Sequence, residues 1–258
     1  MFEGKAQVYK IIRGLFITVL IGGALLRFSA TAGEAVIILN NGDEVRNPSG
    51  KFSVGKNGAI GFRDDTGQVR RLKREDYRLI FTDCPKSVAI VEKYIRLLKF
   101  NEALEASKKV PAGYYWLGWG AFMCYLKAEA YLSQKNYAAA LQELKDARQY
   151  ASYERREAFI RVLKKVIAVE QSKGTEPLPQ NADEGGFLVR GILLEKKKQD
   201  RAAVLEYMKA VMLFPPRDRE GTLNLVRLSA QLRLIRLLKR IGEAGLAQGF
   251  QQQLVKEY

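Results

Sequence analysis

The chain has 258 residues, of which 47% are hydrophobic, so it is long enough for one large or two modest domains with a buried core. It contains no histidine, which removes the commonest general base and the commonest zinc ligand, and its two cysteines are too few for a metal cage. The formal net charge of +15 favours acidic partners such as anionic lipid, phosphate-rich polymer or an acidic protein.

Residues 1–32 have the composition of a secretory signal peptide. A positively charged start precedes an apolar run at 15–26, and Ala30-Thr31-Ala32 is a small-x-small sequence. This pattern predicts cleavage after Ala32 and a mature chain that is periplasmic or secreted. The apolar run is shorter than the roughly 20 residues that a membrane-spanning helix needs. A signal anchor that is retained in the membrane is the alternative.

Residues 33–85 have the pattern of short β-strands separated by turns, and Asn41-Gly42 is the strongest turn signal. Five strands are expected, at 35–39, 51–54, 59–63, 68–72 and 77–82. Strands this short and this closely spaced fit a small, curved barrel of the SH3-like or Sm-like kind. We expect this domain to end at Cys84-Pro85.

The two cysteines, Cys84 and Cys124, lie at this junction and in a predicted helix. They are able to pair if the chain is exported, but a sequence gives no geometry for a disulfide. The paired and the free states therefore both stay open.

Residues 86–258 are predicted to be helical. The apolar spacing places helices at 87–98, 101–109, 121–133 and 137–150, and a longer one at about 153–172. Residues 174–186 contain two prolines and no aliphatic run, so we expect a flexible inter-helix loop or linker there.

Two stretches of the helical part, 124–150 and 187–215, share one pattern of small and aromatic residues. In the second stretch Gly191 and Ala203 are small where two helices are expected to cross, Tyr207 fills the space beside them, and Pro215 ends the unit. The first stretch has matching residues at Ala128, Tyr131, Tyr137, Ala140, Leu144 and Ala147. Fainter copies place Ala103 and Ala247 at the position of Ala140 and Ala203.

This pattern resembles the tetratricopeptide repeat, a helix-turn-helix unit that stacks into binding scaffolds. The matching alanines are separated by 37, 63 and 44 residues, whereas a regular array of this family repeats at roughly 34. We therefore expect a short, interrupted superhelix. An arbitrary bundle of helical hairpins that mimics the pattern is the alternative.

The resemblance also implies a groove, since in this family first-helix side chains line the surface that binds a partner. Carried onto this sequence, those positions give Arg96, Tyr125, Glu129, Ile192, Glu195 and Lys196 as candidate partner-binding residues. Their chemistry is mixed, so the sequence predicts a protein or peptide partner without naming its type.

The positive charge is concentrated in the helical part. Residues 1–32 carry +3, residues 33–85 carry +1 and residues 86–258 carry +11, which add up to the total. Between 219 and 240 a run of basic residues alternates with leucine and isoleucine, and the candidate contacts to an anionic surface are Arg227, Arg233, Arg236, Lys239 and Arg240. One interpretation is an amphipathic membrane-surface helix; the other is a repeat helix with a solvated basic back.

An aromatic cluster at Tyr114, Tyr115, Trp116 and Trp119 also allows two interpretations. It either forms the rim of a pocket for a peptide or a sugar, or packs one helical pair on the next. The β part is almost neutral, which argues against a nucleic-acid partner.

The sequence shows no catalytic pattern, no nucleotide loop and no metal or cofactor site. The prediction is therefore an α+β, mainly α chain: a small N-terminal β barrel followed by an irregular helical repeat domain. Its predicted role is that of a non-enzymatic adaptor of the cell envelope that binds a protein or peptide. The alternative is a membrane-anchored or membrane-surface protein that uses its basic helices to bind anionic lipid or polymer.

Overall fold

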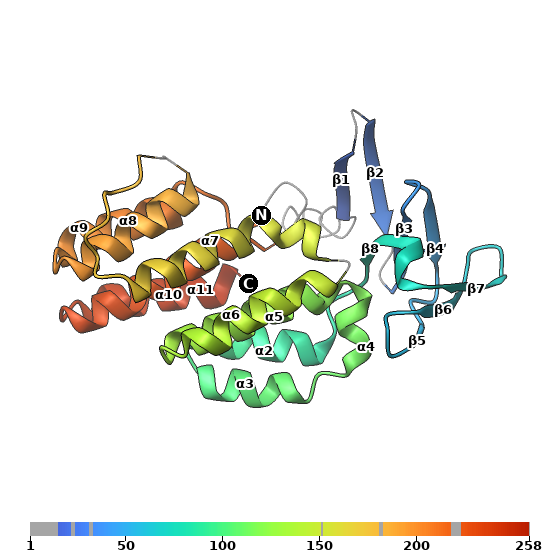
Figure 1. Ribbon diagram of the computed structural model, residues 1–258, viewed down its shortest axis with the longest axis horizontal. Helices are drawn as coiled ribbons and strands as arrows, with labels where there is room; N and C mark the ends of the chain where they lie inside the picture. The colour runs from blue at the N-terminus through green and yellow to red at the C-terminus, as the bar shows by residue number, and fades with distance from the viewer. Residues whose placement is uncertain are drawn as a thin grey trace, which may run out of the picture. The chain divides into compact units, whose positions relative to one another are not determined.

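The computed structural model describes residues 15–21, 24–30, 33–150, 152–180, 183–217 and 223–257, which belong to two compact units (Figure 1). The first unit runs to Asp83 and includes Arg217 and Leu223, which form an antiparallel bridge with each other. The second unit begins at Cys84, runs to Pro216 and resumes at Asn224. The structure confirms an α+β fold that is mainly helical.

The first unit is built from short antiparallel strands. Within the described residues they form a hairpin of β1 and β2, a sheet in the order β4-β3-β8 and a sheet in the order β5-β6-β7. Their bounds are β1 Leu15–Ile21, β2 Ala24–Ala30, β3 Ala35–Leu39, β4 Glu44–Asn47, β5 Ser53–Val54, β6 Ile60–Arg63, β7 Val69–Leu72 and β8 Tyr77–Phe81. A short 3-10 helix, η1 (Arg74–Asp76), leads into β8.

Strand β3 is the centre of this unit's core. Its residues Val36, Ile37 and Ile38 are at most 1% exposed, as expected for a β-branched strand paired on both sides. The hydroxyl of Tyr77 on β8 donates a hydrogen bond of 2.6 Å to the carbonyl of Gly58, which lies in the turn between β5 and β6. This bond links the two three-stranded sheets, and burial raises the pKa of Tyr77 to about 12.

The sequence pattern does not predict strand β4. Its residues Glu44-Val45-Arg46-Asn47 are mostly polar and therefore carry no strand signal, yet they pair with β3 through a four-residue register. Pairing with a buried neighbour, rather than the propensity of these residues, makes the segment a strand.

The segment expected to be the apolar core of an export signal, 15–26, overlaps β1 and the first part of β2, which pair from Leu15–Ala30 to Ile21–Ala24. The basic start and the predicted cleavage position after Ala32 lie outside the described residues. The export signal therefore stays a prediction.

The turn between β6 and β7 depends on Asp64. Its Oδ1 accepts bonds from the Thr66 hydroxyl at 2.6 Å and from the Gln68 amide at 2.9 Å, and Arg70 Nε lies 2.7 Å from Oδ2. The Asp64 side chain is buried, whereas that of its neighbour Asp65 is exposed. Hydrogen bonds from Thr66 and Arg70 lower the pKa of Asp64 from 3.8 to about 2.

The second unit consists of helices in antiparallel pairs, with one longer helix between them (Figure 1). The paired helices are α2 Lys86–Arg96 with α3 Phe100–Lys108, α5 Gly120–Ser133 with α6 Tyr137–Asp146, α8 Glu184–Lys196 with α9 Asp200–Met212, and α10 Leu225–Arg240 with α11 Ala244–Glu257. Helix α7 (Tyr153–Gln171) contacts both α6 and α8. The connections include α4 Ala112–Tyr114, the wide helical turn η2 Tyr115–Trp119 and the 3-10 turn η3 Ala147–Gln149.

The helical pairs share one turn geometry. Within the described residues of this unit, the positive φ values outside η2 and the 172–180 segment fall at Leu98, Lys135, Lys198 and Gly242. Each of these residues donates its amide to the carbonyl three positions earlier, and the next residue donates to the carbonyl five positions earlier. This arrangement satisfies the last carbonyls of the first helix of each pair. The spacings of 37, 63 and 44 residues equal those of the predicted small residues.

The small residues lie where the helices cross. Ala103, Ala140, Ala203 and Ala247 are at most 1% exposed. A Cβ on Gly191 would lie 2.4 Å from Cε1 of Tyr207, so the buried tyrosine ring occupies the space that any side chain there would need. Gly191 therefore allows α8 and α9 to approach closely, as the sequence predicts.

The segment expected to be a flexible loop or linker, 174–186, is held against α8 in its described residues. Arg190 Nη1 donates to the carbonyl of Pro179 at 2.8 Å, and Lys196 Nζ donates to the carbonyl of Ser172 at 2.7 Å. Helix α8 begins inside the predicted linker, since Asp183 caps it by accepting the Gly186 amide. Within the described residues this segment is therefore a tethered loop.

Replacing Gly191 with alanine is expected to destabilise the helical unit by about 2 kcal/mol, because the added methyl group overlaps the fixed Tyr207 ring. Gly249→Ala on α11 is the matched control. Apart from the backbone of its own helix, no atom of the described residues lies within 4 Å of the Cβ it adds, so we expect a gain of up to about 1 kcal/mol from helix propensity. Chemical denaturation followed by circular dichroism measures both, and equal stability of the two variants would contradict the crossing.

Asp64→Asn is expected to destabilise the β6–β7 hairpin at neutral pH. Because the folded pKa of about 2 lies below the unfolded value, the stabilisation is present above about pH 4 and is lost as the pH falls through 2. The difference in hairpin stability between the natural chain and the variant should therefore shrink as the pH falls from about 4 to 2. NMR amide signals of β6 and β7 measure the stability of the hairpin. Asp65→Asn is the control for the loss of an exposed charge. An equal acid dependence in both variants would contradict the role of Asp64.

Candidate functional site in the helical unit

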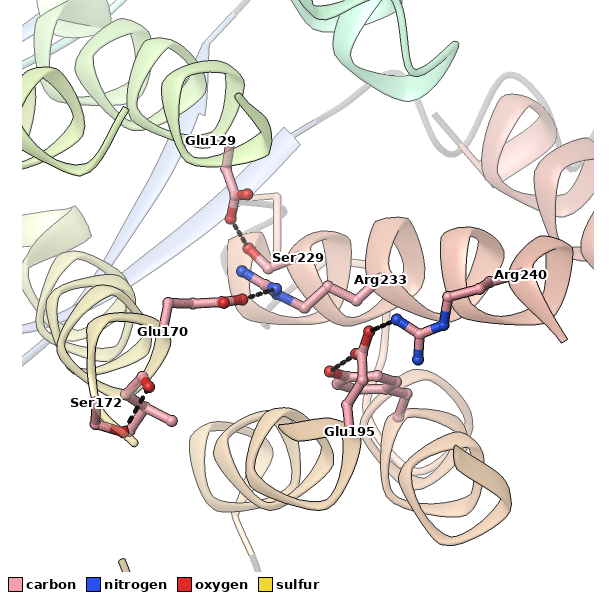
Figure 2. Close-up of polar contacts among 9 residues, drawn as sticks. Glu129, Glu170, Ser172, Glu195, Ser229, Arg233 and Arg240 are labelled. Atoms are coloured by element: carbon pink, nitrogen blue, oxygen red, sulfur yellow. Dashed lines mark hydrogen bonds and ion pairs between the residues drawn. The ribbon is translucent and has the colours of Figure 1, made fainter. Parts of the chain in front are cut away.

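Helix α10 lies inside the helical unit and carries several of its buried polar side chains, namely Arg227, Ser229, Gln231 and Arg233. It contacts α7, α8, α9 and α11, and along 225–235 every residue is buried. Polar side chains removed from water need hydrogen-bond or charge partners. The partners of α10 come from helices far away in the sequence (Figure 2).

The first group of contacts joins α10 to α5. The Tyr125 hydroxyl lies 2.6 Å from the Ser229 hydroxyl and 3.0 Å from the carbonyl of Leu225, to which it donates. The Ser229 hydroxyl in turn donates to Glu129, as Figure 2 shows. Burial raises the pKa of Tyr125 well above its ordinary value, so its hydroxyl stays protonated.

The second group joins α10 to α7. Arg233 Nη1 lies 2.6 Å from Glu170 Oε1, and the Arg233 side chain is only 7% exposed. Burial opposes the charge of this guanidinium, but the carboxylates of Glu170 and Glu129 outweigh it and raise the pKa of Arg233. Among the described residues, Nε and Nη2 of Arg233 have no hydrogen-bond partner.

The third group joins α10 to the α8–α9 pair. Arg240 donates to Glu195 at 2.7 Å and to Asp200 at 2.8 Å, and the Tyr207 hydroxyl donates to Glu195 at 2.9 Å. Arg227 Nε donates to the carbonyl of Val211 at 2.8 Å. Arginine suits this role because its planar group carries several donors in a fixed geometry.

These groups hold charge rather than exchange protons. The carboxylates of Glu170 and Glu195 are paired with arginine, and the buried tyrosines have raised pKa values. Within the described part of the chain, no three histidine, cysteine, aspartate or glutamate side chains are arranged to hold a metal ion. The arrangement favours fastening helices together over chemistry at neutral pH.

The predicted partner-binding residues divide into covered and accessible ones. Tyr125, Glu129 and Ile192 are at most 2% exposed, because α10 fills the face of the first helices that the sequence predicts to be a groove. The first and last pairs also meet, since α11 contacts α2. Arg96, Glu195 and Lys196 keep partial exposure; Arg96 lies 3.5 Å from Glu92.

The predicted contacts to an anionic surface also divide in this way. Arg227 and Arg233 are buried, and the Arg236 guanidinium lies 5.7 Å above the ring of Phe100. Burial, together with the charge of Arg233, lowers the pKa of Arg236. Lys239 and Arg240 are exposed, so only these two of the five candidates are accessible to an anionic surface. Binding to such a surface stays a prediction.

Sequence reasoning misses the two side chains that connect α10 to its neighbours, Ser229 and Glu170. Glu170 ends a long apolar stripe and Ser229 interrupts a leucine-rich one, and neither position has a local signal. The described residues contain no helix with the length and apolar character needed to cross a membrane.

The two cysteines differ in their exposure to solvent. Cys84 is exposed and Cys124 is buried, and neither forms a disulfide bond within the described part of the chain. Burial raises the pKa of the Cys124 thiol to about 12, so this residue is an unreactive part of the core.

Comparison with protein-family models, with curated proteins and with solved structures finds no match to this chain.

Arg233→Gln is expected to destabilise the helical unit by about 3 kcal/mol, because it removes one partner of a buried ion pair and leaves Glu170 without its counter-charge. Arg240→Gln makes the same change on the same helix at a half-exposed position and is expected to cost about 1 kcal/mol or less. Denaturation monitored by tryptophan fluorescence compares them. Equal costs would show that the Arg233 contact contributes no more than a surface pair.

Proposed function

We propose that this chain is a non-enzymatic scaffold of the cell envelope that binds a protein or peptide through its helical unit. The observation that carries the proposal is the turn geometry shared by the helical pairs at Leu98, Lys135, Lys198 and Gly242. Stacked copies of one helix-turn-helix unit extend a surface rather than build a catalytic centre. The spacing supports an irregular tetratricopeptide-like array in which α7 separates two groups of pairs.

The buried polar groups of the helical unit also support a role as a scaffold. A scaffold needs fixed relative positions of its helices, and the contacts of Arg233, Ser229 and Arg240 join α10 to α5, α7 and α8. Each charge among them has an opposite partner, which favours a structural role.

The N-terminal unit is proposed to be a small barrel of the SH3-like or Sm-like kind that accompanies the scaffold. Its support is the pair of three-stranded antiparallel sheets with very short strands, linked by the Tyr77 to Gly58 bond. Export rests on the composition of residues 1–32.

The proposal predicts that the chain, expressed with its own leader, is found in the soluble exported fraction with Gly33 as its first residue. Intact Met1 in the membrane fraction would instead support a membrane-anchored protein. Edman sequencing of the fractionated protein measures this.

A photoreactive residue placed at Lys196 on α8 is expected to cross-link one protein partner, because Lys196 is one of the candidate first-helix positions that stay partly exposed where α10 does not cover them. The same residue at the exposed Lys145 on α6, a second helix, is the control and is expected to give no adduct. Mass spectrometry identifies the adduct. Equal labelling at both positions, or no adduct at either, would contradict a scaffold with a defined binding face.

A further inference from the structure

Helix α9 is an outer helix of the helical unit, and its outward face is apolar (Figure 1). It packs on α8 and α10, and its residues Ala203, Tyr207 and Ala210 are fully buried. On its other side Leu205 is 59% exposed and Met212 is 64% exposed. Single exposed apolar residues are common on protein surfaces, whereas several on one face mark an interaction site.

The exposed apolar residues of α9 form one stripe. Arg201, Leu205, Met208 and Met212 follow one another at intervals of four, three and four residues, which places them on one face of an α-helix. Leu213, the residue after α9, adds a further apolar side chain that is 64% exposed. The stripe runs the length of α9, about 20 Å, with the arginine at its N-terminal end.

Both acids of α9, a helix whose residues are all described, are engaged by basic side chains. Asp200 Oδ1 lies 2.8 Å from Arg240 Nη2. Glu206 is 9% exposed and lies 2.6 Å from Arg190 and 2.5 Å from Lys209. The outward face of α9 therefore presents no acid that would counter a positive charge there.

Two basic side chains at the N-terminal end of the stripe keep their charge uncompensated. Lys198, in the turn that leads into α9, and Arg201 are both exposed. Neither has an acidic partner among the residues that the structure describes. The two side chains are therefore available to an anion outside the chain, and their apolar stems continue the stripe.

A second copy of this chain fits the stripe poorly. A face about 20 Å long and about 10 Å wide offers roughly 200 Å², whereas a stable protein interface buries roughly 800 Å² on each partner. In a symmetric antiparallel pairing of two stripes, Arg201 of each copy would face Met212 of the other, and no acid would meet it.

A soluble polyanion fits only half of the surface. It would pair with Lys198 and Arg201 but would leave the apolar stripe in water. The surface of an anionic membrane satisfies both parts, because its headgroups attract basic side chains and its acyl boundary accepts apolar ones. It also needs no complementary walls, so one convex helix face is enough.

We infer that the outward face of α9 binds reversibly to a membrane surface that contains anionic lipid. Leu205, Met208 and Met212 enter the boundary between headgroups and acyl chains, and Lys198 and Arg201 pair with lipid phosphates. This inference goes beyond the proposed scaffold function, because it says where the scaffold is held while it binds its partner. The contact is reversible because few side chains are inserted.

Co-sedimentation of the purified chain with lipid vesicles tests the apolar part of this surface. We expect binding to vesicles of phosphatidylglycerol and phosphatidylcholine. Leu205→Gln combined with Met212→Gln removes two inserted side chains while keeping helix propensity, and is expected to weaken binding about tenfold or more. Leu246→Gln on α11, where the leucine is 57% exposed, is the matched control and should bind normally.

Charge reversal tests the basic part. Arg201→Glu is expected to weaken binding to the anionic vesicles about tenfold, because each basic residue near the surface contributes to the attraction. Lys145→Glu makes the same change at an exposed position of α6 and is expected to have little effect. Equal losses in the two variants would show that the membrane recognises only the net charge of the chain, and would overturn the inference.

Three further outcomes would overturn it. These are no vesicle binding by a chain that circular dichroism shows to be folded, binding that the double glutamine variant leaves unchanged, and a dimer in analytical ultracentrifugation that this variant dissociates. The last result would assign the stripe to a second copy. If partner cross-linking at Lys196 persists while vesicles are not bound, the scaffold stands and the membrane contact falls.

Discussion

The helical unit depends on the burial of one arginine-bearing helix, α10. A guanidinium removed from water is costly unless an acid meets it, and Glu170 at the end of α7 lies 2.6 Å from Arg233. Arg240 and Ser229 make the corresponding contacts to α8 and α5. These contacts connect the helical pairs that precede α7 with those that follow it. Side chains of α10, in the last pair, therefore hold the two groups of pairs together across α7.

This burial changes how the positive charge of the chain is understood. The same five basic residues that suggest a membrane-surface helix in the sequence include two that are buried, and one that lies over an aromatic ring. Their charge is used to fix helices.

Local sequence signals were sufficient for the helical pairs. The small residues at Gly191 and Ala203 and the turn at Lys198 encode a close crossing, and the structure has that crossing where expected. The candidate site was not predictable to the same degree. Whether Arg233 faces water or Glu170 depends on how α10 packs against α7, because the two residues are 63 positions apart in the sequence. The periodicity of α10 alone does not predict this contact. Likewise β4 is polar and becomes a strand only through pairing with β3.

Amide hydrogen exchange along α10, measured by mass spectrometry, tests the central claim most directly. If α10 is the enclosed centre of the helical unit, peptides from 225–238 exchange among the slowest in the chain and are protected to the level of global unfolding. Fast exchange across this helix, comparable to that of exposed loop segments, would show that α10 lies on the surface and would contradict the account.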